Sequence, residues 1–439
     1  MAFASLSAGQ VRAHARTHRH LLEGSAWLLI GVAITALTGS VFWLLAAHLF
    51  PTAAVGRGAA LWTSVLFVNY ATAMGLPVAV ARFTADDTRP AGALLGWSVA
   101  LTTVTSALGT IAFLLIVRSS SFASLWDWGR PTGYLLMFVM TAGGSVAVLV
   151  DMRLMAARRW GWVLARFTAV GLLRIPLLWL PGIHAHPAFW LFVLAAGPVA
   201  LSGVVGVALL RRLTGDELTL RRPERMREAI EYSSVNYAAT LASDAPKFVL
   251  PVIVLLSVTS VANAVFYVAW SITAIIFVVP VVLSQVLLVE GAKPGAGQRA
   301  QIRIALVISI ALMAMATVGT LLLSDAIVPI YGAAYKASAH VLSLLMVGAV
   351  PWAVTSVYLT QARLVHDRLA TVAITLTLGG AILVPAAVLV PRYGLNGAAA
   401  AWIVGNIAAA LTSVWATHRR ALAPRPDPMA SAPQPVGAR

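Results

Sequence analysis

A stripe of polar and charged side chains runs through the apolar segment 232–256. Asp244 and Lys247 lie one helical turn apart, and three polar residues precede them at spacings of three or four, namely Ser233, Asn236 and Thr240. In a helix this spacing places all five side chains on one face. The segment is long enough to cross a membrane, where ionisable groups are costly and mark binding sites or ion pathways. The stripe therefore predicts a helix face that lines a water-filled cavity.

Arg174 is a second cation inside an apolar segment, 161–181, about 14 residues after Trp160. A guanidinium binds phosphate through two parallel hydrogen bonds, and an ammonium group acts as a compact point charge. Arg174 and Lys247 together would give the cavity a positive charge that binds an anionic substrate group. Two other interpretations stay open. Asp244 and Lys247 form a structural ion pair while Arg174 bonds to a backbone carbonyl, or Asp244 carries a proton or another cation.

Two further segments carry weaker polar patterns. Tyr267 belongs to a shorter polar stripe in the segment 261–288, and Asn69 lies just before Gly75 and Pro77 in the segment 58–81. Hydrogen bonds between helices are a common role for such side chains in membranes. Contact with a substrate is the alternative, and it makes Asn69 and Tyr267 additional candidates for the cavity.

Long apolar stretches separated by short polar breaks determine the predicted fold class. The chain is 60% hydrophobic and 10% charged, whereas soluble domains carry roughly 25% charged residues. About 20 residues of helix cross the hydrocarbon core, and a helix satisfies its own backbone hydrogen bonds there. We therefore expect an all-α polytopic membrane protein. Its twelve predicted spans are 24–49, 58–81, 91–117, 132–153, 161–181, 187–210, 232–256, 261–288, 303–324, 338–361, 369–390 and 394–417.

The lysines and arginines behind the net charge of +16 are distributed unevenly between the two sides of the predicted membrane. With the N-terminus placed in the cytoplasm, 24 of the 31 lysines and arginines fall on the inner side and 5 on the outer side. This asymmetry follows the positive-inside rule. It predicts that both termini are cytoplasmic, and it accounts for the charge without a nucleic-acid partner. Asp151 and Arg153, at the inner end of the fourth span, are predicted to form a surface cluster of charges.

The two halves of the chain resemble each other when one is shifted by 208 residues. The shift lays Trp62 on Trp270 and the pair Arg211-Arg212 on Arg419-Arg420. Six spans in each half make the repeats parallel, and transporters built in this way bind substrate between the halves. The expected domains are an N-terminal six-helix lobe at 1–210 with a cytoplasmic arm at 1–22, a cytoplasmic linker at 211–230, a C-terminal six-helix lobe at 231–418 and a disordered cytoplasmic tail at 419–439.

The chain offers no pattern that is typical of an enzyme. It has no cysteine, no Walker-type phosphate loop, no cluster with metal-ligand spacing and no paired nucleophile and base. A membrane polymerase or ligase would need a large outer loop with acid–base residues, and the predicted outer loops are short. We therefore expect no enzyme activity, no cofactor and no bound metal.

Several short motifs occur in an order that resembles one family of membrane proteins. They are Val55-Gly56-Arg57-Gly58, Gly75-Leu76-Pro77, Asp244-Ala-Pro-Lys247, Phe266-Tyr-Val-Ala269, Ile327-Val-Pro-Ile-Tyr-Gly-Ala-Ala-Tyr335 and Tyr393-Gly-Leu-Asn-Gly-Ala-Ala-Ala-Ala401. Together they cover most of the chain. This arrangement is similar to the oligosaccharide/O-antigen flippases of polysaccharide biosynthesis, a branch of the multidrug/oligosaccharidyl-lipid/polysaccharide (MOP) exporter superfamily that also contains the multidrug MATE transporters.

The resemblance implies a V-shaped, MATE-like pair of six-helix lobes in the bacterial cytoplasmic membrane. It implies alternating access and the export of polyprenyl-(pyro)phosphate-linked oligosaccharides. Because the chain has no nucleotide site, we expect the driving force to be an ion gradient, with H⁺ or Na⁺ as the coupling cation, or the membrane potential. Membrane lipids, glycosyltransferases and a polymerase of the same pathway would be the other partners. Lys247, and by depth Arg174, would match the family's cationic lumen. The chain departs from some flippases in its first span, whose only charged residue is Glu23 at the cytoplasmic edge.

Two other transporter classes are the alternatives. An ion-coupled multidrug exporter of the MATE type prefers cationic drugs and would need a cavity lined by carboxylates, whereas Asp244 is the one carboxylate at the centre of a predicted span. A major-facilitator transporter normally carries a Gly-x-x-x-Asp-Arg pattern between its second and third spans. The corresponding loop here, 82–89, lacks that glycine spacing.

Overall fold

Helices form nearly all of the part of the chain that the structure describes. The computed structural model describes residues 8–85, 91–117, 120–221, 223, 226–291, 298–365 and 367–422, and these ranges contain no strand. The first half consists of α1 (Ala8–Leu49), α2 (Thr52–Thr72), α3 (Leu76–Phe83), α4 (Gly92–Ile116), α5 (Arg130–Ala156), α6 (Trp160–Arg174) and α7 (Pro187–Thr214). The second half consists of α8 (Met226–Ser257), α9 (Ser260–Gly291), α10 (Gln298–Ile327), α11 (Ala337–Val347), α12 (Ala349–Leu364) and α13 (Arg368–Leu422).

Each of the twelve predicted spans has a counterpart among these elements. Nine helices or joined helices within the described ranges are long and apolar enough to cross a membrane, and the bent pair α2 and α3 makes a tenth. The 55-residue helix α13 contains non-helical torsion angles at Gly394, so it supplies two crossings. The more polar α8 is the remaining one. The prediction of an all-α polytopic membrane protein is confirmed.

The second span differs from its prediction because it is bent. The axes of α2 and α3 meet at 56°. Between them, Met74 and Gly75 have φ angles of 49° and 70°, in the left-handed region that commonly ends a helix. Pro77 then lies in the first turn of α3, where its missing N–H costs nothing. The bend is therefore encoded locally by Gly75 and Pro77.

The helix bounds repeat with the shift of 208 residues that the sequence indicates. α1 ends at Leu49 and α8 at Ser257; α2 begins at Thr52 and α9 at Ser260; α7 ends at Thr214 and α13 at Leu422. The two halves are thus built from corresponding helices in the same order, which makes them parallel repeats.

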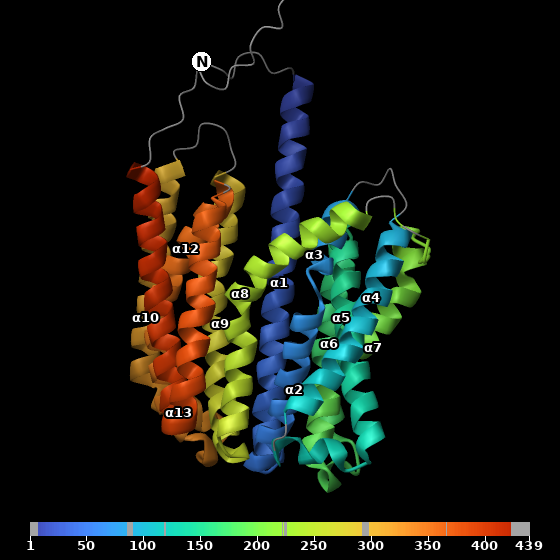
Figure 1. Cartoon of the computed structure of the whole chain (residues 1–439), viewed down its shortest axis with the longest axis vertical. Helices are drawn as coiled ribbons and strands as arrows, with labels where there is room; N and C mark the ends of the chain where they lie inside the picture. Colours follow the sequence, from blue (N-terminus) through green and yellow to red (C-terminus); the bar gives the residue numbers. More distant parts are fainter. Residues whose placement is uncertain are drawn as a thin grey trace, which may run out of the picture.

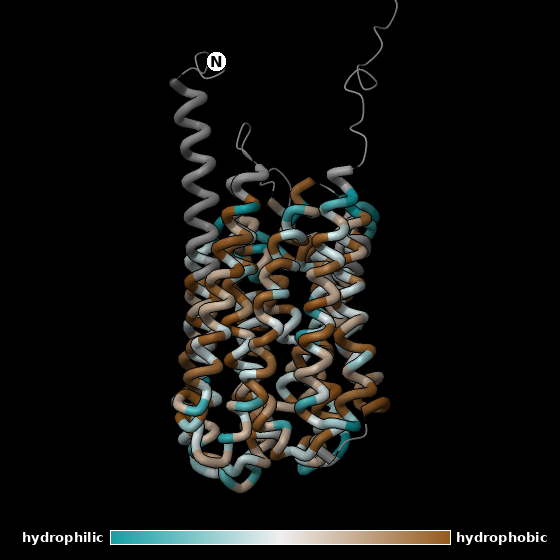
Figure 2. The backbone as a smooth tube through the Cα atoms, turned by 90° about the vertical axis from the view of Figure 1, so that its left-hand side faces the viewer, coloured by the Kyte–Doolittle hydropathy of each residue, from teal (hydrophilic) through white to brown (hydrophobic). Residues whose placement is uncertain are grey.

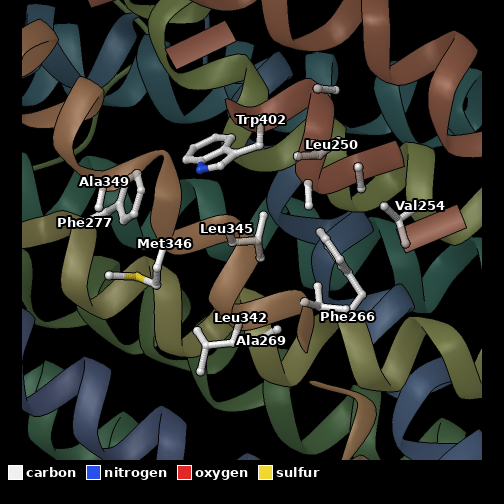
Figure 3. Packing of buried hydrophobic residues seen from close by; sticks show 14 of the residues in the cluster. Leu250, Val254, Phe266, Ala269, Phe277, Leu342, Leu345, Met346, Ala349 and Trp402 are labelled. Carbon is white, nitrogen blue, oxygen red and sulfur yellow. The ribbon is translucent and has the colours of Figure 1, made fainter. Parts of the chain in front are cut away.

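Figure 1 shows the helices of the two halves as two groups, with α1 standing between them and α8 running obliquely from one group to the other. Hydrophilic residues gather towards the two ends of the bundle and apolar residues dominate its middle (Figure 2). The core of the second half is drawn from α8 to α13, and Figure 3 shows Phe266, Leu345 and Trp402 among its buried side chains. Smaller buried clusters hold the first half together.

The two halves are in close contact at the end of the bundle opposite to the start of α1. The first turns of α2 and α9 meet there, and the Asn263 side-chain amide donates to the Gly56 carbonyl oxygen over 2.9 Å. A Cβ atom on Gly56 would lie 1.8 Å from the carbonyl oxygen of Ser260. Only glycine permits this approach, so the α2–α9 contact depends on Gly56.

Candidate functional site

Asp244 and Lys247 form an ion pair on α8. Lys247 Nζ lies 2.5 Å from Asp244 Oδ1, and the two side chains are 41% and 28% exposed, respectively. Pro246 and Pro251 lie inside the same helix, where they interrupt its backbone hydrogen bonds and permit bending. The predicted pairing at a spacing of three residues is confirmed, and both side chains remain accessible at mid-helix.

Side chains from both halves surround this ion pair. The Tyr70 hydroxyl of α2 donates to Asp244 Oδ2 over 3.3 Å, and Lys247 Nζ lies 5.5 Å from the centre of the Trp352 ring on α12. Arg363, also on α12, interacts electrostatically with Asp244 and Tyr70. We refer to Tyr70, Asp244, Lys247 and Arg363 as the central charge cluster. It carries two cations and one carboxylate, and its members come from α2, α8 and α12.

Two members of the central charge cluster were missed by the sequence reasoning. Arg363 was counted among the cytoplasmic charges that follow the tenth span, although α12 continues to Leu364 and keeps it near Asp244. Tyr70 had no signal beyond its place next to Asn69.

Arg174 lies in a separate and buried place. It is 8% exposed and is the last residue of α6; a short 3-10 helix begins two residues later at Pro176. Its guanidinium carbon lies 5.2 Å from the centre of the Trp62 ring on α2, and its Nε has no hydrogen-bond partner. The groups that interact with it electrostatically are Tyr267 and Arg166, and no described carboxylate is among them.

Tyr267, from the second half of the chain, covers the site that holds Arg174. It belongs to α9, and its ring packs edge-on against Trp43 of α1 with 4.8 Å between ring centres. Its hydroxyl interacts with Arg174 and forms a side-chain hydrogen bond with Trp62. Arg174 therefore lies behind the contact of α2 with α9. A buried cation without a carboxylate partner is costly, and such groups in membrane segments mark functional sites.

Asn69 belongs to a third place, a pocket at the bend between α2 and α3. Its Oδ1 accepts a hydrogen bond of 2.8 Å from Ser145 of α5. The pocket has a volume of about 310 Å³ and is lined by side chains of α2, α3, α5 and α8, with Tyr70, Tyr237 and Phe248 among them. We call it the bend pocket. Its lining is almost entirely apolar.

The structure thus separates candidates that the sequence placed in one lumen. Asp244 and Lys247 lie together, Arg174 and Tyr267 lie together, and Asn69 faces the bend pocket. The groups that interact with Arg174 are Tyr267 and Arg166, and not Lys247. Asn236 and Thr240 lie on α8, but their side chains are outside the described residues. Within the described ranges, no group of three metal-ligating side chains is close enough to hold a metal ion.

The prediction of a surface charge cluster at Asp151 and Arg153 was wrong, because both side chains are buried. Asp151 pairs with Arg166 of α6, whose Nε donates to its Oδ1 over 2.7 Å. Arg153 pairs with Asp216, with 2.6 Å between Nε and Oδ2. These two ion pairs tie α5 to its neighbours inside the first half, and neither contains Arg174 or Lys247.

Comparison with known proteins identifies this helical arrangement at the level of fold. No family model matches the chain, and no curated protein matches it. Among solved structures, a multidrug resistance MATE family transporter in an inward-facing conformation is 15% identical, with 90% of this chain and 98% of that chain covered and a TM-score of 0.64. The chain has the fold of the MOP superfamily transporters.

Two further structures show the range of proteins with this fold. The lipid II flippase MurJ in an inward closed conformation is 11% identical, with 89% of this chain and 87% of that chain covered and a TM-score of 0.68. A MOP superfamily transporter from Pyrococcus furiosus is 16% identical, with 92% and 95% covered and a TM-score of 0.60. For the latter protein, the reverse polarity of its binding pocket suggests a different function. The predicted MATE-like fold is confirmed, and the major-facilitator alternative is not supported.

Proposed function

We propose that this protein is a flippase that moves polyprenyl-(pyro)phosphate-linked oligosaccharides across a bacterial cytoplasmic membrane by alternating access. The central charge cluster is the observation that carries the proposal. An accessible Lys247 lies near the Trp352 ring of α12, Arg363 of the same helix interacts with Asp244, and Asp244 is the carboxylate of this cluster. A cavity with this excess of positive charge suits a phosphate group, which accepts charge-assisted hydrogen bonds from lysine and arginine.

The two places that hold cations differ in access, and this difference suggests a path for the phosphate. Lys247 is open to the space between the halves, whereas Arg174 lies behind Tyr267 of α9. We infer that the headgroup first meets Lys247 and Arg363. When the halves part at the α2–α9 contact, Tyr267 withdraws and Arg174 becomes the cation that faces the departing phosphate.

The energy for net transport would come from an ion gradient or from the membrane potential. Moving one elementary charge through the membrane field is worth about 2.3 kcal/mol per 100 mV. Asp244 is the group of the central charge cluster that could take up H⁺ or Na⁺, because it is partly exposed and already bridges Lys247 and Tyr70. Loss of its negative charge would release both partners.

The multidrug alternative is less well supported by the charges. A cationic drug at the centre would meet Lys247 and Arg363, and the carboxylate of Asp244 is already paired with Lys247. The MATE transporters that share the fold are too distant in sequence, at 15% identity in the inward-facing example, to transfer their substrates to this chain.

The topology and partners belong to the same proposal. Both termini would be cytoplasmic, with the two lobes at 1–210 and 231–418, the linker at 211–230 and the tail at 419–439. The protein would act as a transporter without enzyme activity, beside glycosyltransferases and a polymerase that make and use the glycan.

Transport by the purified protein in proteoliposomes tests the proposed function. A fluorescent polyprenyl-diphosphate-linked oligosaccharide is reconstituted in both leaflets, and its exposure outside is followed by a membrane-impermeant quencher, with and without a pH or Na⁺ gradient. We expect protein-dependent flipping of this lipid and no protein-dependent uptake of ethidium, a cationic drug. Uptake of ethidium without flipping of the lipid would favour the multidrug alternative.

A further inference from the structure

The bend pocket is an apolar cavity that the proposed path of the phosphate does not use. It lies where Gly75 and Pro77 redirect the second span, and Ser145 and Val148 of α5 form its opposite wall. Val78 and Val148 are 42% and 41% exposed, so the pocket is open on that side. A sizeable apolar cavity with few polar groups is the usual form of a small-molecule site.

The bend pocket adjoins the central charge cluster directly. Tyr70 belongs to both, because its ring lines the pocket and its hydroxyl donates to Asp244. Phe248, the residue after Lys247, lines the pocket and packs against the Tyr70 ring with 4.8 Å between ring centres. A ligand with a phosphate at Lys247 and an apolar chain would therefore have its first carbons at the pocket.

Together, a cationic site and an adjoining apolar cavity suit an amphipathic anion. We propose that the bend pocket holds the first isoprenoid units of the carrier lipid while the phosphate is bound at Lys247 and Arg363. This inference rests on the proposed function and deepens it. The part of the isoprenoid tail nearest the headgroup is bound in a protein pocket during transport, and the remainder of the tail stays in the bilayer.

The size of the pocket sets how much of the chain fits. A cavity of roughly 150 Å³ accommodates one benzene molecule, and an isoprene unit, with five carbons, is of similar size. The bend pocket, at about 310 Å³, therefore has room for about two isoprene units. The aromatic rings of Tyr70, Tyr237 and Phe248 provide flat apolar surface for these branched, unsaturated units.

A series of prenyl phosphates of increasing length tests how many isoprene units the bend pocket holds. Binding of dimethylallyl, geranyl and farnesyl phosphate, which carry one, two and three units, is measured by calorimetry on the full chain in phosphatidylcholine nanodiscs. We expect affinity to rise by about tenfold or more from one unit to two, because a second unit becomes buried. From two units to three it should rise by less than about threefold beyond partition into the lipid. An equal gain at each step would overturn the proposal.

Variants that fill the bend pocket with a larger side chain provide the matched comparison with the unmodified protein. Val148→Trp should remove the gain from the second unit, whereas Val139→Trp, on the same helix and at 44% exposure, should keep it. The leucine variant Ala73→Leu provides a milder filling, and thermal melting shows which variants are folded. A retained chain-length gain in both folded pocket variants contradicts the proposal, as does displacement of geranyl phosphate by an equal concentration of phosphatidic acid, because the pocket would then be a general lipid site.

Failure of this inference can be told apart from failure of the proposed function. If the pocket variants bind all three ligands like the unmodified protein while Lys247→Ala binds none of them, the phosphate site is supported and the proposed site for the isoprenoid tail is wrong. If the unmodified chain binds none of the three ligands, both the phosphate site and the pocket proposal are contradicted.

Discussion

The hydroxyl of Tyr70 donates to Asp244 Oδ2 over 3.3 Å, and this hydrogen bond joins α2 of the first half to α8 of the second. The same carboxylate pairs with Lys247 through its other oxygen. Asp244 therefore links a contact between the halves to Lys247, an accessible cation of the central charge cluster. A phosphate that competes for Lys247 would change the charge around Asp244 and, through it, the contact with Tyr70.

Removing the Tyr70 hydroxyl should loosen the contact between the halves. In Tyr70→Phe we expect the contact between the halves to lose about 0.5–1.5 kcal/mol of stability, the typical worth of one hydrogen bond. The population of molecules in which the two halves are separated should therefore increase. The chain has no cysteine, and spin labels on cysteines introduced at Leu220 and Leu369, both well exposed, would report the distance distribution. Tyr393→Phe, at an exposed tyrosine, serves as the control, and an unchanged distribution in Tyr70→Phe would rule out this role.

Neutralising Asp244 should strengthen binding of anions. In Asp244→Asn, Lys247 loses its ion-pair partner and the charge of the cluster rises by one. We expect affinity for inorganic pyrophosphate to increase by about tenfold, on the order of 1.4 kcal/mol, and this gain should shrink at high salt. Calorimetry at two salt concentrations measures it. Weaker binding by the folded variant would show that Asp244 itself contributes to the anion site.

A side chain at Gly56 should prevent closure at the α2–α9 contact. The added Cβ of Gly56→Ala would lie 1.8 Å from the Ser260 carbonyl oxygen, whereas a Cβ on Gly319 meets no atom within 4 Å. We therefore expect Gly56→Ala, but not Gly319→Ala, to lengthen the distance between spin labels on cysteines introduced at Arg130 and Lys336. The same distance in all three proteins would mean that this contact does not control opening.

Breaking the buried ion pair of Arg153 with Asp216 should reduce stability far more than breaking the exposed ion pair of Arg211 with Glu217. Removing one partner of a buried pair leaves an uncompensated charge and costs about 3–5 kcal/mol, so Asp216→Ala should lower the melting temperature in detergent markedly. The adjacent Glu217 pairs with Arg211 at the surface, where such pairs are worth about 0–1 kcal/mol. Glu217→Ala should therefore melt close to the unmodified protein, and equal losses in both variants would contradict the assignment.

The sequence was sufficient to predict the helices because each apolar run is as long as a membrane crossing. It also predicted the pairing of Asp244 with Lys247, which depends only on helical spacing. It was not sufficient to relate Arg174 to Lys247, since position along a span does not tell which neighbouring helices a side chain meets. Arg174 meets Trp62 and Tyr267, and only the packing of α2, α6 and α9 decides this.

The errors near the predicted cytoplasmic ends of the spans have a similar origin. Asp151 and Arg153 were predicted at the surface because they are neighbouring charges at a span end, whereas their partners are Arg166 of the next helix and Asp216, which follows α7. Arg363 is exposed as a charge at a span end should be, but it also interacts with Asp244. The charge pattern predicts the side of the membrane, and tertiary packing determines which of those charges become buried.

The central claim is that Lys247 and Arg174 bind the phosphate of a lipid-linked oligosaccharide during its passage. The most direct measurement is the rate of flipping in proteoliposomes by Lys247→Ala, Arg174→Ala and the exposed control Lys336→Ala, each verified as folded. We predict that the first two lose about tenfold or more in rate, since a hydrogen bond to a charged group is worth about 1.5–3 kcal/mol, and that the control keeps its rate. Full flipping activity in both Lys247→Ala and Arg174→Ala would contradict the account.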